Sequence, residues 1–571
     1  MRHRACLDDD WRFALGHAAD PSRDFEFARD RSLVKSGEAR GAAGVKFDDS
    51  GWRRVDLPHD WAIELPLVQR EDREFCEHGF HAIGPDYPEN SVGWYRKRFS
   101  LSQWFPDKPG SGQHTSAAGR SGSRAATPLR HHPAARWWIE FDGVFRDSVV
   151  WLNGHRLGRH ASGYTPFRFD VTDLIEPSEE NVLVVRADAT SYEGWWYEGA
   201  GIYRHVWLLR VQPLHVASTF VTSVARAGAA WVTARTMIRN DAEEVARFTL
   251  SSEVLDPAGQ RVARVRSRPL LLAPFSSMEI AQKLRVRNPR LWSCEDPALY
   301  RLRSTLDRGR GVLTDEHHTT FGIRSIRWDA RRGFFLNGRH LKIKGTCNHQ
   351  QHAGVGIAVP DALWEWRLNK LKEMGSNAIR CSHYMVAPEV LDICDRLGLL
   401  VMAENRLADV GPQFLADFET MILRDRNHPS IILWSIGNEE HTIQWSEAGE
   451  RIGRTLVRTA HRLDPTRKVT AAMHDRGLGA GFANVVDVHG WNYIHVGDIE
   501  AFHRRRPDQP IIGSEEGSTV TTRGEYADDP ERGYVSAYDR RHPKWGSTAQ
   551  KWWKFFAERD WIAGGFVWTG F

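Results

Sequence analysis

The chain has 571 residues and a mass of 65.2 kDa, which at roughly 150 residues per domain indicates three or four domains and excludes a single small binding module. Hydrophobic residues make up 41% and charged residues 26% of the sequence, proportions typical of a folded protein rather than a disordered one. The net charge of +4 is too small at this size to argue for a nucleic-acid or membrane partner.

No targeting or membrane segment is predicted. The longest apolar runs, such as residues 431–434, have the length of a strand and fall far short of the roughly 20 residues of a membrane span. The start, MRHRACLDDDW, reaches acidic residues before any apolar stretch, unlike a signal peptide. The six cysteines form no C-x-x-C pair, which favours reduced thiols. We therefore expect a cytoplasmic location.

Residues 93–209 consist of short alternating runs, such as WYRKRFSL and NVLVVRAD, separated by Gly, Asn, Asp and Pro turns. This pattern predicts a β-sandwich. Residues 103–136 interrupt it with a stretch rich in Gly, Ser, Pro, Ala and Arg that has no acid after Asp107. We expect this insert to be a disordered loop. Its basic residues could bind an anion, but a solvated loop is the simpler interpretation.

The remaining chain divides into two further parts. Residues 215–323 contain a second set of alternating strands with turns at about ten-residue spacing, which predicts a smaller sandwich. Beyond them, eight apolar strand-like runs alternate with helical stretches, which predicts a (β/α)₈ barrel. The last run ends with the chain, so no sequence remains for an eighth helix. We expect exposed apolar surface or a partner there, and a truncated product.

Polar residues that end the barrel strands are the candidates for chemistry, because the active sites of such barrels lie at the carboxyl ends of the strands. Together they would form a cleft of carboxylates, imidazoles, amides and one indole. In chain order they are His349, His352, Arg380, His383, Glu404, Asn405, Asn438, Glu439, Glu440, His489, Asn492, Tyr493, Glu515, Glu516 and Trp568.

Two carboxylates across such a cleft can cleave a glycosidic bond, one as the acid toward the leaving oxygen and the other as nucleophile or base. Glu439 and Glu515 are the best candidates, since they end the fourth and seventh strands. For a retaining mechanism we predict carboxyl groups about 5 to 5.5 Å apart. The alternative is a metal site built from His349, His352 and Glu404, although sugar hydrogen bonding is the more common use of such groups. Neither G-x-x-x-x-G-K-[ST] nor G-x-S-x-G occurs, which weakens nucleotide and serine-hydrolase interpretations.

At IILWSIGNEE the sequence closely resembles the β-galactosidase, β-glucuronidase and β-mannosidase family of glycoside hydrolases, family two. Further matching blocks include DGVFRDSVVWLNG, YEGAGIYRHVWL, NAIRCSHY and PIIGSEEGS. The resemblance covers nearly the whole chain from Leu7 onward except the insert at residues 103–136. It implies a jelly-roll-like, sugar-binding-like sandwich over residues 1–213, an immunoglobulin-like sandwich over 214–325, and a catalytic barrel over 326–571 that lacks its last helix.

The resemblance also implies roles for individual residues in a retaining enzyme. Glu439 corresponds to the acid/base and Glu515 to the nucleophile, and we expect the side chain of Glu516 to point away from the site. The implied substrate-binding residues are Asn438 at the sugar 2-hydroxyl, Arg380 and Tyr493 at the nucleophile, His383 at a sugar hydroxyl, Trp568 as a stacking platform, and His349, His352, Glu404 and Asp188. For Asp188, a structural turn carboxylate is an equal alternative.

Two departures from the family pattern change the expected contacts. Magnesium-dependent relatives carry E-x-H after the third strand, whereas this chain has AENRLADVG with Ala408 and Val410 at those places. We therefore expect no such magnesium site, no metal and no cofactor. The first strand ends in HQQH, where relatives commonly have an acid between the histidines, so Gln350 and Gln351 would alter substrate contacts.

The sequence thus favours a retaining exo-β-galactosidase that acts on a carbohydrate substrate. β-Glucuronidase and β-mannosidase are the alternatives within the same chemistry. A truncated, non-catalytic carbohydrate-binding relative is the alternative from another class. A homo-oligomer is compatible with the sequence, and the sugar, linkage and aglycone are not determined by it.

Overall fold

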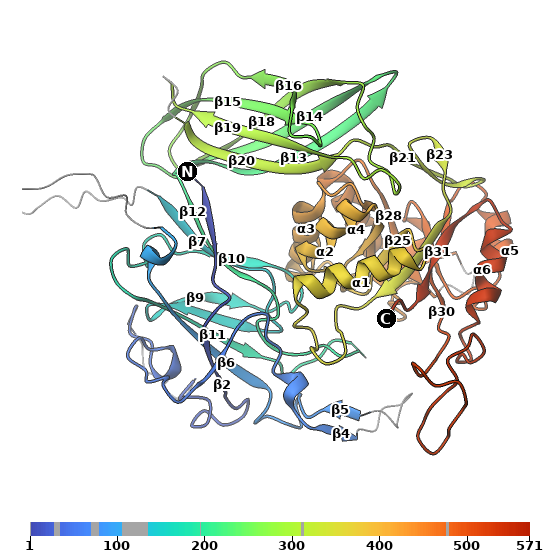
Figure 1. Cartoon of the computed structure of the whole chain (residues 1–571), viewed down its shortest axis with the longest axis horizontal. Helices are drawn as coiled ribbons and strands as arrows, with labels where there is room; N and C mark the ends of the chain where they lie inside the picture. Colours follow the sequence, from blue (N-terminus) through green and yellow to red (C-terminus); the bar gives the residue numbers. More distant parts are fainter. Residues whose placement is uncertain are drawn as a thin grey trace, which may run out of the picture.

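The protein is described here by a computed structural model that covers residues 2–27, 35–69, 79–105, 135–194, 196–309, 313–474 and 479–571. Figure 1 shows two antiparallel β regions beside an α/β barrel, with the amino terminus near the junction of the β regions. This architecture confirms the predicted fold class. The predicted loop at residues 103–136 lies, except at its two ends, outside the described residues.

The first β region consists of two antiparallel sheets with strand orders β1-β12-β7-β10 and β3-β2-β6-β11-β8-β9. The strands that the sequence predicts here are present, and several shorter ones add to them. A small hairpin of β4 (Leu67–Gln69) and β5 (Gly79–His81) lies outside both sheets. The sheet strands are β1 (His3–Cys6), β2 (Trp11–Leu15), β3 (Arg53–Val55), β6 (Val92–Phe99), β7 (Arg136–Phe141), β8 (Ser148–Leu152), β9 (His155–His160), β10 (Phe167–Asp170), β11 (Asn181–Asp188) and β12 (Val206–Val211).

The second β region pairs a three-stranded sheet, β13-β14-β18, with a sheet ordered β16-β15-β19-β20, to which β17 adds. Buried and more exposed residues alternate along β14, as expected of a strand with one face on a core. The strands are β13 (Leu214–Arg226), β14 (Ala229–Asn240), β15 (Ala246–Leu255), β16 (Arg261–Arg266), β17 (Leu270–Leu272), β18 (Ser276–Arg287), β19 (Leu299–Asp307) and β20 (Leu313–Gly322).

A closed parallel barrel follows a small sheet of β21 (Ile326–Asp329), β22 (Gly333–Leu336) and β23 (Arg339–His340). All eight predicted barrel strands are present, and β31 closes the barrel by pairing with β24. The barrel strands are β24 (Ile343–Asn348), β25 (Ala378–Cys381), β26 (Leu400–Glu404), β27 (Ile431–Asn438), β28 (Lys468–Met473), β29 (His489–Asn492), β30 (Ile511–Gly517) and β31 (Ile562–Trp568).

Six α-helices connect the described barrel strands, and local signals set their ends. The side chain of Ser446 caps the start of α4 by accepting the backbone N–H of Gly449, and Gly398 ends α2 in a left-handed conformation that glycine adopts without strain. No helix in the described part of the chain is long and apolar enough to cross a membrane. The helices are α1 (Asp361–Glu373), α2 (Pro388–Leu397), α3 (Pro412–Asp425), α4 (Glu447–Leu463), α5 (Ile499–Arg505) and α6 (Ala549–Ala557).

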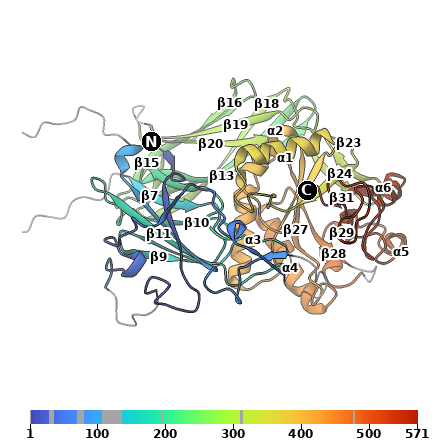
Figure 2. The ribbon, with the colours of Figure 1, turned by 60° about the horizontal axis from the view of Figure 1, so that its bottom comes forward.

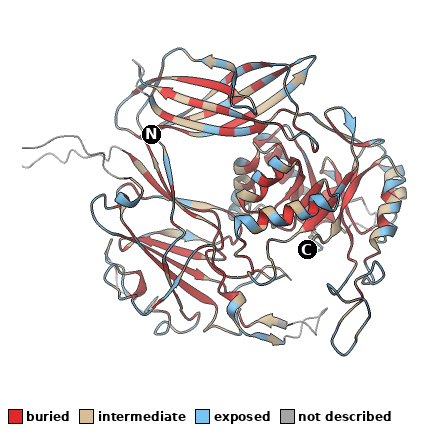
Figure 3. Cartoon of the chain, in the orientation of Figure 1, coloured by how far each residue is buried: buried red, intermediate tan, exposed pale blue. Residues whose placement is uncertain are grey.

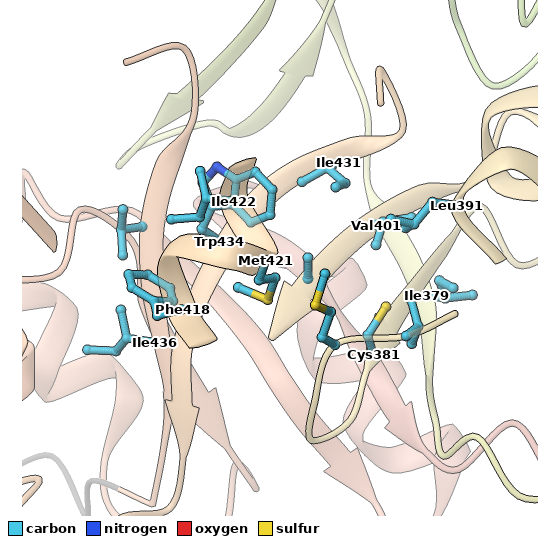
Figure 4. Close-up of a cluster of buried hydrophobic side chains, with 14 of the residues drawn as sticks. Ile379, Cys381, Leu391, Val401, Phe418, Met421, Ile422, Ile431, Trp434 and Ile436 are labelled. Atoms are coloured by element: carbon cyan, nitrogen blue, oxygen red, sulfur yellow. The ribbon is translucent and has the colours of Figure 1, made fainter. Parts of the chain in front are cut away.

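The largest hydrophobic core lies between the barrel strands and the helices α1 to α4. Figure 4 shows part of this core, in which Phe418 and Met421 of α3 face Trp434 of β27. Apolar residues that face inward fill this layer, while the outer faces of the helices carry the exposed side chains (Figure 3). The layer holds the barrel strands, and with them the ends that carry the polar residues.

The last strand is buried for most of its length, over residues 562–566. Ile562 is buried and packs with Trp552 and Phe556 of α6. The exposed aromatic side chains lie next to it instead, where the rings of Trp366 and Phe571 are 6.0 Å apart and are 43% and 48% exposed. Trp366 of α1 and Phe571 thus form an exposed aromatic pair.

The first sandwich packs directly on the barrel, and the two views of Figures 1 and 2 agree on this arrangement. Buried Asp60 accepts the backbone N–H of Ile357 at 2.9 Å. Buried Arg204 donates to the carbonyl oxygen of Met385 at 2.7 Å and to Gln350 at 3.0 Å. These buried hydrogen bonds cross the boundary and help to fix the sandwich against the barrel mouth.

Candidate active site

The barrel brings most of the predicted site residues together at the carboxyl ends of its strands. At the centre lies Arg380, a fully buried guanidinium from β25. Its Nε and Nη2 donate to the two oxygens of Glu404 at 2.9 and 2.8 Å, and its Nη1 donates to Glu515 Oε2 at 2.9 Å. Nη2 also donates to the side-chain oxygen of Asn438 at 2.7 Å. One cation thus links the ends of strands β26, β27 and β30.

Glu515 is held from two sides. Besides Arg380, the hydroxyl of Tyr493 donates a short hydrogen bond to Glu515 Oε1. Burial raises the pKa of Glu515 and the nearby charge of Glu439 adds to this, while Arg380 and the hydrogen bond from Tyr493 oppose it. The net shift of the Glu515 pKa is upward. Arg380 and Tyr493 act against this shift and favour the ionised form of the carboxyl.

Glu439 lies at the end of β27 and has a positive φ of 45°. The amide nitrogen Nδ2 of Asn492 is 2.9 Å from Glu439 Oε1 and 3.5 Å from Glu515 Oε2. These two oxygens are therefore separated by no more than the sum of the two distances, about 6.4 Å. His441 Nε2 lies 3.6 Å from the other oxygen of Glu439. The two predicted carboxylates face one another across a single amide.

Glu404 supports this group from inside the barrel. Burial opposes its ionisation, but the charge of Arg380 and the hydrogen bond from His383 lower the pKa of Glu404 to about 2. Nδ1 of His383 is 2.8 Å from Glu404 Oε1. Burial lowers the pKa of His383, and a neutral imidazole whose Nδ1–H donates to a carboxylate presents Nε2 as an acceptor. Glu404 thus orients both a cation and an imidazole.

Aromatic groups complete the side of the site formed by β24, β25 and β31. The ring of His383 stacks on Trp568 with centroids 5.2 Å apart and planes 9° apart. The ring of His349 lies perpendicular to Trp568 at the same distance. An indole with two imidazoles beside it offers an apolar face and polar atoms together, which suits a sugar ring with its hydroxyls.

The structure separates two predicted residues from this group. Asp188 accepts from Arg186 at 3.1 Å and from Thr190 at 2.6 Å, and it lines a surface pocket of about 390 Å³ on the first sandwich. The ring of His352 contacts Trp366 and Phe571. Neither has a described contact with the paired carboxylates, so the structure does not support direct sugar contacts for them.

Two glutamates next to the candidate pair point elsewhere. Glu516 is fully buried and accepts the backbone N–H of Ile494 at 3.0 Å. Burial raises its pKa well above the ordinary value, which favours the neutral form of this carboxyl. Glu440 accepts the backbone N–H of Ala408 at 3.0 Å. The expected outward direction of Glu516 agrees with these contacts.

The described residues contain three groups of His, Cys, Asp or Glu whose ligand atoms lie within 4.8 Å of one another. None of the three includes His349, His352 or Glu404, the set considered as a metal alternative. The groups are Cys6, Asp8 and His205; His205, Asp361 and Glu389; and Asp392, Asp395 and His428.

Sequence reasoning missed two residues beside the site. Trp196, between β11 and β12, places its ring centroid 5.1 Å from His349 and 5.5 Å from His383. Arg406, just after β26, lies over that indole, with its guanidinium carbon 4.8 Å from the ring centroid. The available signal was weak: a tryptophan in the turn-rich stretch YEGWWYEG, without a periodic pattern that would assign it to a core.

A parallel barrel whose strand ends bring two carboxylates to one amide, beside an indole and imidazoles, has the arrangement of an enzyme that hydrolyses glycosidic bonds. The comparisons with known proteins agree. Residues 214–324 match the family model "Glycosyl hydrolases family 2", and residues 330–417 and 410–568 match "Glycosyl hydrolases family 2, TIM barrel domain". The chain belongs to glycosyl hydrolase family 2.

Relatives with curated names include both galactosidases and glucuronidases. The chain is 35% identical to Beta-galactosidase BoGH2A of Bacteroides ovatus over 100% of its own length and 68% of that protein. It is 31% identical to a putative beta-glucuronidase of Formosa agariphila, over 92% of the chain and 49% of that protein. The chain therefore spans between about half and two thirds of the length of these relatives.

Solved structures share the fold across the whole chain. A family 2 member from Bacteroides cellulosilyticus superposes with a TM-score of 0.75 at 28% identity, covering 99% of this chain and 66% of that one. A Bacteroides uniformis beta-glucuronidase superposes with a TM-score of 0.76 at 25% identity, covering 100% of this chain and 65% of that one.

Proposed function

We propose that the protein is a retaining exo-β-glycosidase that removes terminal β-D-galactosyl residues. The observation that carries the proposal is the pairing of Glu439 and Glu515 around the amide of Asn492. Retaining enzymes hold their carboxyl groups about 5 to 5.5 Å apart and inverting enzymes about 6.5 to 9.5 Å apart. The two facing oxygens lie at most about 6.4 Å apart, a close spacing that is compatible with the retaining class.

The two carboxylates would act in two steps. In the first, Glu439 donates a proton to the glycosidic oxygen while the carboxylate of Glu515 attacks the anomeric carbon, so that the aglycone leaves and a glycosyl ester forms. In the second, Glu439 accepts a proton from water as the water oxygen displaces Glu515. Arg380 and Tyr493 hold Glu515 ionised and oriented before the first step.

The side of the site near Trp568 supports a sugar as the bound group. Its indole can stack against the ring C–H face, and His349 and His383 can hydrogen-bond hydroxyls. The 2-hydroxyl would meet Asn438, whose side-chain oxygen is already oriented by Arg380. Such a contact strengthens in the oxocarbenium-like transition state.

β-Glucuronidase is the second candidate, because several named relatives and solved neighbours carry that name. A glucuronidase needs a cation that faces the sugar C6 carboxylate. Arg380 is occupied by Glu404, Glu515 and Asn438, and Arg406 pairs with Glu193. The greater identity to a protein named as a galactosidase, over the full chain, supports galactose as the first candidate.

The test is hydrolysis of 4-nitrophenyl β-galactoside, β-glucuronide and β-mannoside by the wild type, Glu515→Gln and Glu439→Gln. Glu516→Gln is the matched control, since it changes the adjacent carboxyl that points away from the site. We expect turnover of the galactoside, loss with Glu515→Gln, and retention with Glu516→Gln. Proton NMR should detect β-galactose as the first-formed anomer.

Each alternative has its own result. Turnover of the glucuronide alone would replace galactose by glucuronic acid and leave the mechanism standing. A first-formed α-anomer would refute the retaining assignment. No turnover of any glycoside by folded protein would refute the enzyme and favour a carbohydrate-binding role.

A further inference from the structure

Residues 193–194 and 196–198, between β11 and β12, reach from the first sandwich to the barrel mouth. Its residue Trp196 contacts barrel residues through three rings: the centroids lie 5.1 Å from His349, 5.5 Å from His383 and 5.8 Å from Tyr384. The first two are the imidazoles that flank Trp568. A side chain from the sandwich thus lies directly behind the aromatic wall of the barrel site.

Charged groups fix this indole from its other side. The guanidinium carbon of Arg406 is 4.8 Å from the ring centroid, within the range of a cation–π contact. Arg406 Nη2 donates to the carbonyl oxygen of Glu193 at 2.5 Å, and Arg406 Nε lies 3.3 Å from Glu193 Oε2. Arg146, from the sandwich, also pairs with Glu193. The carboxylate of Glu193 therefore ties the indole segment to both bodies.

The segment is also closed on itself. The buried carboxyl of Glu198 lies 3.1 and 3.0 Å from the backbone nitrogen of Glu193. It also accepts the hydroxyl of Tyr164 at 3.0 Å. The indole Nε1 of Trp196 donates to that same hydroxyl oxygen at 3.3 Å, and Tyr164 stacks on Tyr384 at 4.3 Å. The polar edge of the indole is therefore bonded to the protein.

The order of the strands around the barrel places this indole relative to the reaction. The carboxylates come from β27 and β30, whereas the contacts of Trp196 are with residues that follow β24 and β25. A sugar with its anomeric carbon at Glu515 and its face on Trp568 directs the hydroxyls farthest from the leaving group toward His349 and His383. The ring of Trp196 contacts both of these imidazoles.

We propose that Trp196 closes the sugar site at its non-reducing end and limits the enzyme to terminal, unsubstituted sugars, with Arg406 as the positioning residue that holds the indole in place. This inference rests on the proposed glycosidase function, and it attributes the restriction to terminal, unsubstituted sugars to one side chain. A second sugar on the hydroxyl beside the indole would overlap a rigid apolar wall, and its own hydroxyls would lose water without gaining partners.

The test compares Trp196→Ala with the wild type on two substrates. One is 4-nitrophenyl β-galactoside, and the other is the same glycoside carrying a further sugar on the galactose 4-hydroxyl. With the simple galactoside we expect KM to rise by roughly tenfold, the effect of losing one aromatic contact, with a smaller change in kcat. With the extended glycoside we expect the variant, and not the wild type, to release nitrophenol together with an intact disaccharide.

Arg406→Ala tests whether Arg406 positions the Trp196 indole, separately from the contact of the indole itself with the sugar. It should raise KM for the galactoside in the same direction as Trp196→Ala but by less, and Arg406→Lys should restore part of the loss because the cation remains. Trp231→Ala is the matched control, an exposed tryptophan on the second sandwich, and should change neither substrate. Trp196→Phe serves if the alanine variant does not fold, with an intermediate KM expected.

The inference is overturned if Trp196→Ala and Trp196→Phe keep KM within about twofold of the wild type and release no disaccharide. If the wild type hydrolyses neither substrate, the proposed function fails, and calorimetric titration then decides the inference separately. Binding of galactose by the wild type, with binding of the 4-O-extended disaccharide only by Trp196→Ala, would support it. Equal binding of both sugars by the wild type, or of neither sugar by either protein, would refute it.

Discussion

The buried cluster around Arg380 makes a quantitative prediction about stability. Glu404→Gln replaces a fully buried carboxylate that accepts two hydrogen bonds from Arg380. The amide keeps the shape of the side chain but removes the charge, and its NH₂ group must face the guanidinium or the imidazole of His383. The variant thus leaves a buried cation with Glu515 as its remaining carboxylate partner.

Two independent estimates give the size of the loss. The pKa of Glu404 falls from 4.5 to about 2, and at about 1.4 kcal/mol per unit this shift corresponds to about 3 kcal/mol of stability near neutral pH. Removing one partner of a buried ion pair costs about 3 to 5 kcal/mol in general. We therefore expect Glu404→Gln to lower the free energy of opening the barrel by about 3 to 4 kcal/mol at neutral pH.

The sign of the pH dependence follows from the lowered pKa. The stabilisation is fully present above the pKa of this group in the unfolded chain, 4.5, and is lost as pH falls toward the folded value. At about pH 3 it should shrink to less than about half of its value at neutral pH. Urea titration with pulsed hydrogen exchange of peptides from β26 and β27 measures the opening of the barrel apart from the sandwiches.

Glu365→Gln is the matched control, because Glu365 forms an exposed ion pair with Arg396 at 2.6 Å. Exposed pairs contribute less than about 1 kcal/mol. The reasoning is refuted if Glu404→Gln costs no more than Glu365→Gln, or if the gap between the wild type and Glu404→Gln is the same at acid and neutral pH.

Three further substitutions follow from the same contacts. Tyr493→Phe removes a donor to Glu515 and should lower kcat roughly 10- to 100-fold. The loss of this donor should also raise the pKa of Glu515, so the acid limb of the rate profile should move to higher pH. An acid limb at the same pH as in the wild type would contradict this. Asp188→Asn should leave kcat/KM within about twofold, since the carboxylate bonds Arg186 and lines another pocket; a large loss of activity would return Asp188 to the sugar site. Glu516 has a raised pKa, so the wild type should lose stability as pH rises above about 4.5. Glu516→Gln should remove that loss, which denaturation at acid and alkaline pH would measure. If the stabilities of the wild type and Glu516→Gln changed with pH in parallel, a buried neutral acid would be excluded.

Local patterns in the sequence were sufficient for the strands and for much of the site. Alternation of apolar and polar residues predicted the sandwich strands such as β14, and apolar runs between helical stretches predicted all eight barrel strands. Parallel strands end at one rim, so a residue that follows each run, such as Glu439 or Glu515, is placed at that rim without knowledge of any distance. Opposite faces of one strand likewise separate Glu515 from Glu516.

The sequence could not show which groups meet across the rim or between the sandwich and the barrel. The sequence predicts that Arg380 lies near the nucleophile. Only side-chain distances show that its guanidinium donates to Glu404, Glu515 and Asn438. Asp188 ends β11 and Trp196 lies in the connection that follows, yet Asp188 lines a pocket on the sandwich and Trp196 contacts the barrel imidazoles.

The physical reason is the range over which each signal acts. Periodicity reports which face of an element is buried, because the chain repeats that environment every two or four residues. A contact such as that between Trp196 and His349, or between Arg406 and Glu193, joins segments that lie far apart along the chain and leaves no repeat in either of them. The sequence by itself determined the barrel and its paired carboxylates, and only the packing of the sandwich on the barrel decided which side chain closes the site.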